Sequence, residues 1–192
     1  KWTRRGLLTT GLVVGGGLAV GIALRPGNRL PELAKHVAGE DETLLNTWLK
    51  LDTENNVTVI VPHSEMGQGV GTALTQMLAD ELDADWDLVK FEEAPAIEAF
   101  ANHSMGRGML APGDLPEMIV PTVTGVMIKA AQALDLQITG GSLSIRTTGE
   151  YGMRVAGATV KQMLKDAAAA AWQVPASEIV TRESHLHHKP SN

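Results

Sequence analysis

The sequence predicts an α/β fold in which helices cover a mixed sheet. Apolar and polar residues alternate over 48–52, and a polar turn separates them from the β-branched run over 57–61, a pattern typical of a hairpin. Apolar residues then recur at helical spacing over 74–82. A further strand is expected at 88–91. The alternation of strand and helix patterns favours a layered architecture.

The second half of the chain predicts two more helices and a short strand. Residues 94–120 are rich in Pro and Gly and predict a long excursion. Helices are expected over 121–134 and 151–172, and a strand over 179–181. The apolar face of the sheet is expected to consist of Val57, Val59, Val61, Val89 and Phe91, and the buried stripe of the helix over 121–134 of Val123, Val126, Met127, Ala130, Ala131 and Leu134.

The composition limits the classes of partner and metal site. The 192 residues include 22 acidic and 16 basic side chains, for a net charge of −6, and only 4% are aromatic. DNA or RNA is therefore not expected as a partner. The absence of cysteine excludes disulfides, thiolate metal sites and a cysteine nucleophile. No metal site made by this chain's own residues is predicted.

Residues 1–26 are expected to be an export signal or a membrane anchor. Arg4 and Arg5 precede the uncharged, glycine-rich run GLLTTGLVVGGGLAVGIAL at 6–24. Paired arginines before such a run are typical of a twin-arginine signal. The run has 19 residues, marginally enough for a helix to span a bilayer. We therefore expect export to the periplasm, with 6–24 as the segment for any anchoring in the inner membrane.

The rest of the chain divides into a linker and a folded domain. Residues 27–46 are polar and contain Pro31 and the acidic run at 40–42, so they are expected to be a linker with one short helix. The regular strand and helix patterns begin immediately afterwards, which places the folded α/β domain at 47–192.

Two loops rich in small residues are candidates for binding chemistry. The first, HSEMGQGVGT at 63–72, lies between a predicted strand and a predicted helix. Its glycines permit a close approach of the backbone to a ligand, and the helix that follows directs free N–H groups at the loop, so we expect an anion site there. The second, TGGSLS at 139–144, precedes the third helix. Either loop could instead serve only the fold, as a tight turn or a helix cap.

The first loop differs in its spacing from two known phosphate-binding motifs. A Walker A loop requires a lysine after the last glycine, and Thr72 follows Gly71 directly. A dinucleotide fingerprint requires a later third glycine, although Glu92 could take the place of its ribose-binding acid. An NAD- or FAD-binding domain therefore stays open as one alternative. A non-catalytic, membrane-tethered interaction module is another.

The two loops carry a specific family resemblance. EMGQGV, a helix ending in ADELDADW, and GGSLS before an alanine-rich helix resemble, in this order, the molybdopterin-binding large subunit of the xanthine dehydrogenase and aldehyde oxidase family. The bacterial isoquinoline 1-oxidoreductase β-subunit type is the most similar. The resemblance implies one half of a molybdopterin-binding domain. It also implies oxidation of aldehydes or N-heterocycles with water as the oxygen source.

The same resemblance implies a cofactor, its contacts and its partners. The cofactor is molybdopterin with molybdenum, commonly as the cytosine dinucleotide. Partners would be the remainder of the large subunit, a small subunit with 2Fe–2S clusters and a cytochrome c subunit. The catalytic base would lie outside this chain, which alone would be inactive. The cofactor-binding residues carried over are Met66, Gly67, Gln68 and Gly69 in the first loop, and Gly141, Ser142 and Ser144 in the second.

Several further features are interpreted without a ligand. Glu65 is expected to be a structural carboxylate at the start of a loop or helix. The aspartates at 83, 85 and 87 lack the glycine and glutamate of a calcium loop. The H-x-H-H cluster at 185–188 is interpreted as a polar strand end. Arg107, between two glycines, could reach a phosphate, although a loop with no ligand is the simpler interpretation.

Overall fold

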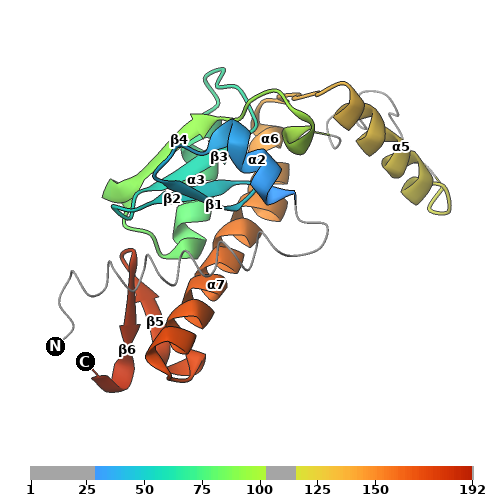
Figure 1. Cartoon of the computed structure of the whole chain (residues 1–192). Helices are drawn as coiled ribbons and strands as arrows, with labels where there is room; N and C mark the ends of the chain where they lie inside the picture. The colour runs from blue at the N-terminus through green and yellow to red at the C-terminus, as the bar shows by residue number, and fades with distance from the viewer. Residues whose placement is uncertain (1–28, 103–115, 192) are drawn as a thin grey trace.

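The computed structural model describes residues 29–102 and 116–191. It confirms the α/β fold, with a four-stranded mixed sheet covered by helices (Figure 1). The predicted signal and Arg107 lie outside the described residues. Among the helices of the described part of the chain, none combines the length and the apolar character that crossing a bilayer requires.

The main sheet has the strand order β1-β2-β3-β4. Strands β1 (Glu42–Asn46), β2 (Leu49–Asp52) and β3 (Val57–Val61) form antiparallel pairs, as the predicted hairpin requires. Strand β4 (Val89–Glu93) is parallel to β3, and helix α3 (Val70–Leu82) connects the two. This crossover places the glycine-rich loop at the carboxyl end of β3, the edge at which ligands bind in open α/β sheets.

The main core lies between the sheet and the helices behind it. Val57, Val59 and Val61 are buried on one face of β3 and belong to one apolar cluster with Leu74 and Leu78 of α3. The other members of this cluster come from the β1–β2 segment, from α3 and from the long C-terminal helix: Leu45, Leu49, Val70, Leu82, Met153, Ala156 and Val160. The predicted inward alternation along β3 is therefore confirmed.

The opposite face of β3 has a smaller core under helix α2 (Leu30–Val37). Ile60 points to this side, together with Leu44, and both are buried with Phe100. The Phe100 and Trp48 rings pack in a T-shaped arrangement, with 6.0 Å between their centroids. β3 is therefore buried on both faces, which explains its continuous run of β-branched residues.

A long helical segment lies behind the sheet. Helix α6 (Ser142–Thr148), a π-helical turn (Gly149–Met153) and helix α7 (Arg154–Trp172) follow one another without a break. A side chain at Gly157 would collide with the backbone carbonyl of Leu78, so this glycine permits the close contact between α7 and α3. The predicted third helix is therefore confirmed, and it is extended toward its N-terminus by α6.

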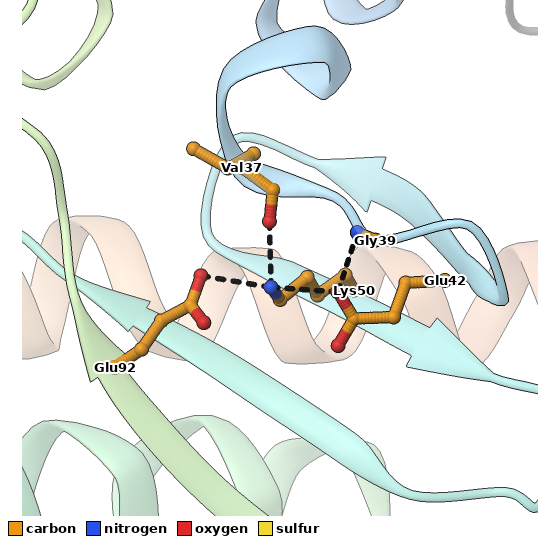
Figure 2. A network of polar contacts seen from close by, with 5 residues as sticks. All are labelled: Val37, Gly39, Glu42, Lys50 and Glu92. Atoms are coloured by element: carbon orange, nitrogen blue, oxygen red, sulfur yellow. Dashed lines mark hydrogen bonds and ion pairs between the residues drawn. The ribbon is translucent and has the colours of Figure 1, made fainter.

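A buried lysine joins α2, β2 and β4 (Figure 2). The Nζ of Lys50 donates to the carbonyl of Val37 at 2.6 Å and lies 2.8 Å from Glu42 and 2.9 Å from Glu92. Burial alone would lower the pKa of Lys50, but its hydrogen bonds to both carboxylates outweigh burial and hold the pKa above its ordinary value. Burial alone would raise the pKa of Glu42, but the hydrogen bonds from Lys50 and from the N–H of Gly39 outweigh it and hold this pKa below its ordinary value.

The C-terminal segment forms a separate two-stranded hairpin. Strands β5 (Ile179–Arg182) and β6 (His185–His188) are antiparallel, and β5 includes the predicted strand. Ser184 at the turn ties the hairpin to the rest of the domain: its N–H donates to the carbonyl of Asp83 at 2.9 Å, and its hydroxyl accepts from the N–H of Asp85 at 2.7 Å.

Three expectations from the sequence need correction. Residues 27–46 contain the expected short helix, α2, but also strand β1, which pairs with β2 and completes the sheet, so they are not a linker. Helix α5 (Val120–Ala133) has nearly the expected bounds, but only Ala131 of its apolar stripe is buried, and Val126 is 61% exposed. Phe91 is half exposed rather than part of the core, because β4 is an edge strand of the sheet; its ring lies beside Gly71 at the start of α3.

Candidate functional site

The glycine-rich loop connects β3 to α3 and depends on two glycines. Gly67 and Gly69 have φ angles of 92° and 76°, in the left-handed region that other residues adopt at a cost. A Cβ added at either position would meet nothing within 4 Å. Glycine is therefore required here by backbone conformation, and the space in front of both residues is open.

The carboxylate of the exposed residue Glu65 accepts hydrogen bonds from the backbone of this loop. Its Oε1 accepts from the N–H of Gly67 at 2.8 Å and of Gly69 at 2.9 Å, and its Oε2 from the N–H of Gly71 at 3.4 Å. The hydrogen bond from Gly69, with those from Gly67 and Gly71, holds the pKa of Glu65 below its ordinary value. The expected structural carboxylate is therefore present.

This contact corrects the prediction of an anion site at the start of α3. The N–H groups of Gly67, Gly69 and Gly71 already donate to Glu65, which also places a negative charge at the positive end of the helix dipole. An external phosphate at the same amides would have to displace Glu65.

Gln68 holds the outer turn of the loop. Its Oε1 accepts from the N–H of Met66 at 2.6 Å, and its Nε2 donates to the carbonyl of Ser64 at 3.0 Å. Gln68 is half-buried, whereas the Met66 side chain is 61% exposed. The amide keeps one further N–H and one oxygen lone pair for a ligand.

The second loop also depends on a glycine and on an internal hydrogen bond. Gly141 has a φ angle of 57° directly before helix α6. Ser144 is fully buried, and its hydroxyl accepts from the N–H of Gly140 at 2.7 Å. Ser142 is exposed at the first position of the helix. Gly141 and Ser142 form the accessible part of this loop, whereas Ser144 is enclosed, and the cofactor contacts expected of all three stay predictions.

The two loops meet at the same edge of the sheet, although 75 residues separate Ser64 from Thr139. The N–H of Ser64 donates to Oγ1 of Thr139 at 3.0 Å. One residue earlier, Nε2 of His63 lies 2.7 Å from Oγ1 of Thr148, at the end of α6. These two contacts bring the first residues of the glycine-rich loop beside Thr139 and Thr148.

His63 has a role that the sequence reasoning missed. The ring is only 4% exposed, and among the described residues its Nδ1 has no hydrogen-bond partner. Burial lowers the pKa of His63, and the backbone carbonyl of Ile138 opposes this effect in part. A histidine two residues after a strand buried on both faces is the signal that could have identified it.

The structure gives the nucleotide alternative little support. Glu92, the candidate for contact with a ribose, is paired with Lys50 instead (Figure 2). The amides that would receive a pyrophosphate donate to Glu65. Both groups that a dinucleotide would require are therefore engaged within the chain.

The other candidate ligands lie apart from the two loops. Within residues 29–102 and 116–191 no group of histidines and carboxylates could hold a metal ion. His188 in β6 contacts Glu178 at 2.8 Å and Ser191 at 2.7 Å, as expected for a polar strand end. Asp83 accepts from Lys161 and Thr181, so it is part of the hairpin contact and not a freely solvated charge.

Comparisons with known proteins identify the family of this fold. Residues 11–107, half of the chain, match the family model of a molybdopterin cofactor-binding domain. This match contains the glycine-rich loop but ends before the second loop. The subunit beta of isoquinoline 1-oxidoreductase from Brevundimonas diminuta is 30% identical over 148 residues, 76% of this chain. A membrane-bound aldehyde dehydrogenase [pyrroloquinoline-quinone] from Gluconacetobacter polyoxogenes is 37% identical over 90 residues, 46% of this chain.

The relatives are much longer than this chain. The matched segments span 15% of the Brevundimonas protein and 11% of the Gluconacetobacter protein. The similarity therefore concerns one part of each relative.

Proposed function

Because the chain belongs to the molybdopterin cofactor-binding domain family, we propose that it forms the N-terminal part of the large subunit of a molybdenum hydroxylase. The observation that carries the proposal is the meeting of the loops at 63–69 and 139–142 at one sheet edge, through the contact between Ser64 and Thr139. The reaction would be the oxidation of an aldehyde or an N-heterocycle, the two substrate types in the names of the relatives.

The residues present fit the cofactor as a cradle of glycines and neutral polar side chains, in which the Glu65 carboxylate is bound to the amides of its own loop. Gly67 and Gly69 leave open space in front of the backbone, and Gln68 has spare hydrogen-bonding capacity beside it. Because Glu65 occupies the amides at the start of α3, the first loop would contact the pterin ring and not its phosphates. Ser142 would bind a polar group of the cofactor from the second loop. Ser144 would support this loop from below by holding the N–H of Gly140.

Within this arrangement the residues of this chain would bind and orient the molybdopterin cofactor, and the bound molybdenum would supply the redox chemistry. The backbone at Ser64 and Met66 holds the side-chain amide of Gln68 in one orientation. In this orientation the amide would contact the cofactor. Met66, exposed beside it, would exclude water from the bound ring. These residues position the cofactor, and we assign the proton-transfer groups to the remainder of the large subunit.

The exposed helix α5 supports a larger assembly. Leu134 is 67% exposed, and Lys129 is the only charged residue between Val120 and Ala133. An amphipathic helix normally buries its apolar stripe, yet Val126 of this stripe is 61% exposed. We propose that the remainder of the large subunit covers it, and that a small 2Fe–2S subunit and a cytochrome c subunit accept the electrons. Export to the periplasm by the twin-arginine route completes the proposal.

Gln68→Ala in the full-length protein, expressed with its partner subunits, tests the function. The cofactor would lose a contact, so molybdenum and pterin per large subunit should fall severalfold in this variant. Gln162→Ala, whose side chain binds Asp166 on the exposed surface of α7, is the matched control and should retain both. Molybdenum is measured by mass spectrometry and pterin by the fluorescence of an oxidised extract.

Two results would contradict the proposal. A pyrroloquinoline quinone in active wild-type protein, without molybdenum or pterin, would favour the cofactor in the name of the Gluconacetobacter relative. Unchanged cofactor content and activity in Gln68→Ala would favour an interaction module whose loops only stabilise the fold.

A further inference from the structure

His63 and Thr148 connect the bases of the two candidate loops. His63 is the first residue of the glycine-rich loop, two positions after β3 ends, whereas Thr148 ends the helix that begins at Ser142. The 2.7 Å contact between their side chains is therefore a direct link between the two structural units that carry Gln68 and Ser142. Neither side chain is on the exposed surface of its loop.

Both His63 and Thr148 lie in closely packed surroundings. The His63 ring is enclosed, and the residue after Thr148, Gly149, is buried where a side chain would collide with Met77 of α3. Close-packed surroundings of this kind leave little room for adjustment. A change in the contact would therefore shift one loop relative to the other.

The contact with Thr148 is the hydrogen bond that orients the His63 ring. Among the described residues, Nδ1 of this ring has no hydrogen-bond partner. The contact between Nε2 and the Thr148 hydroxyl can form in either tautomer of the ring, because a hydroxyl both donates and accepts.

We propose that His63 and Thr148 are positioning residues that set the distance between the loops of Gln68 and Ser142, and thereby determine how tightly molybdopterin is retained. This inference rests on the function proposed above. It assigns a role to two residues that lie below the loops and leaves contact with the cofactor to Gln68 and Ser142.

Thr148→Val in the complete enzyme with its partner subunits tests this role. Valine keeps the shape of threonine and removes the hydroxyl. Losing one such hydrogen bond should reduce retained molybdenum and pterin about fivefold. Thr148→Ser should retain both. Thr147→Val is the matched control, because the neighbouring Thr147 hydroxyl only donates to the carbonyl of Leu143 in its own helix.

Two further measurements separate positioning from general stability. The thermal midpoint of the cofactor-free Thr148→Val protein should fall, because the buried His63 ring loses its hydrogen-bond partner. Gly157→Ala, which destabilises the domain away from the two loops, is therefore the stability control and should retain the cofactor, and KM of the loaded fraction of Thr148→Val should not change. His63→Gln, which can place a polar atom near the position of Nε2, should retain more cofactor than His63→Leu. If His63→Leu does not fold, the comparison of Thr148→Val with Thr148→Ser decides the question.

The outcomes distinguish this inference from the function on which it rests. Wild-type protein without molybdenum and pterin would overturn both. Loaded wild-type protein, with Thr148→Val retaining as much cofactor as Thr147→Val, would overturn only the positioning role. An equal loss in Thr148→Val and Thr148→Ser would also overturn it, because serine preserves the hydroxyl.

Discussion

The backbone N–H of Ser64 donates to Oγ1 of Thr139 at 3.0 Å, and this contact joins two loops that are distant in the sequence. Ser64 begins the exposed part of the glycine-rich loop, and Thr139 begins the segment TGGS. The shared site therefore depends on a hydrogen bond from main chain to side chain in addition to the buried contact between His63 and Thr148.

Thr139→Val should expose the Ser64 amide. The variant removes the acceptor, so the amide should exchange with solvent deuterium severalfold faster than in the wild type. Thr139→Ser keeps an acceptor and is the control. Amide exchange followed by NMR measures both. Equal protection of Ser64 in all three proteins would show that the loops do not meet in solution.

Gly157→Ala should destabilise the domain. The added methyl group would meet the carbonyl of Leu78, so α7 and α3 would have to separate. Such overpacking typically costs about 1–3 kcal/mol in the free energy of unfolding. Gly125→Ala in α5 is the matched control: its Cβ meets nothing within 4 Å, and it should be neutral or stabilising by up to about 1 kcal/mol. Urea denaturation measures both, and equal midpoints would contradict the close contact.

Lys50→Met should destabilise the domain by about 2–3 kcal/mol, because two carboxylates lose their buried partner. This loss of stability is smaller than the loss expected for a fully buried ion pair, because Glu92 is partly exposed. Lys35→Met is the control, since its ion pair with Glu32 is fully at the surface and its loss should not change the urea midpoint. A Lys50→Met protein as stable as the wild type would show that the network in Figure 2 adds nothing to stability.

Acid should remove the contribution of this network. The folded-state pKa of Glu42 lies below its ordinary value of 4.5, so its contribution is complete above pH 4.5 and is lost as the pH falls through the folded value. The difference in urea midpoint between wild type and Lys50→Met should therefore shrink between about pH 5 and pH 3. A constant difference over this range would argue against the ion pair.

The Glu65 contact can be observed directly by titration. Its folded-state pKa lies below 4.5, chiefly because the N–H of Gly69 donates to the carboxylate. The amide resonances of Gly67 and Gly69 should therefore shift together, with a midpoint below that value. In Glu65→Gln this titration should disappear. Amide shifts of the wild type that do not change with pH would indicate that the carboxylate points into solvent.

The sequence was sufficient for the elements whose patterns are local. The β-branched run at 57–61 and the helical spacing after Val70 identified the βαβ unit, and the small residues identified the two loops. The contact between these loops could not be predicted, because it depends on hydrogen bonds between residues about 75 positions apart in the chain. Glu65 was correctly expected to be structural, but its particular partners could not be foreseen, because they depend on the left-handed conformations of Gly67 and Gly69.

The remaining features depend on tertiary contacts. Strand β1 has no alternating pattern and is completed by pairing with β2, so it was mistaken for part of a linker. Lys50 occupies a polar position in an alternating strand, which normally indicates a solvated side chain, yet α2 covers this face. The apolar stripe of α5 predicted burial, but its side chains find few partners among the described residues.

The π-helical turn between α6 and α7 changes the direction in which the side chains of α6 face relative to those of α7. One extra residue in a turn rotates the preceding segment by about 100° relative to an uninterrupted α-helix. On the α7 side of the turn, the residues that face the core are Ala156, Met153 and Gly149. On the α6 side, the residues that face inward are Thr148 and Ser144. Deleting a single residue within 149–153 would turn Thr148 away from His63 while α7 kept its place, so the length of this turn fixes the direction in which the second loop faces.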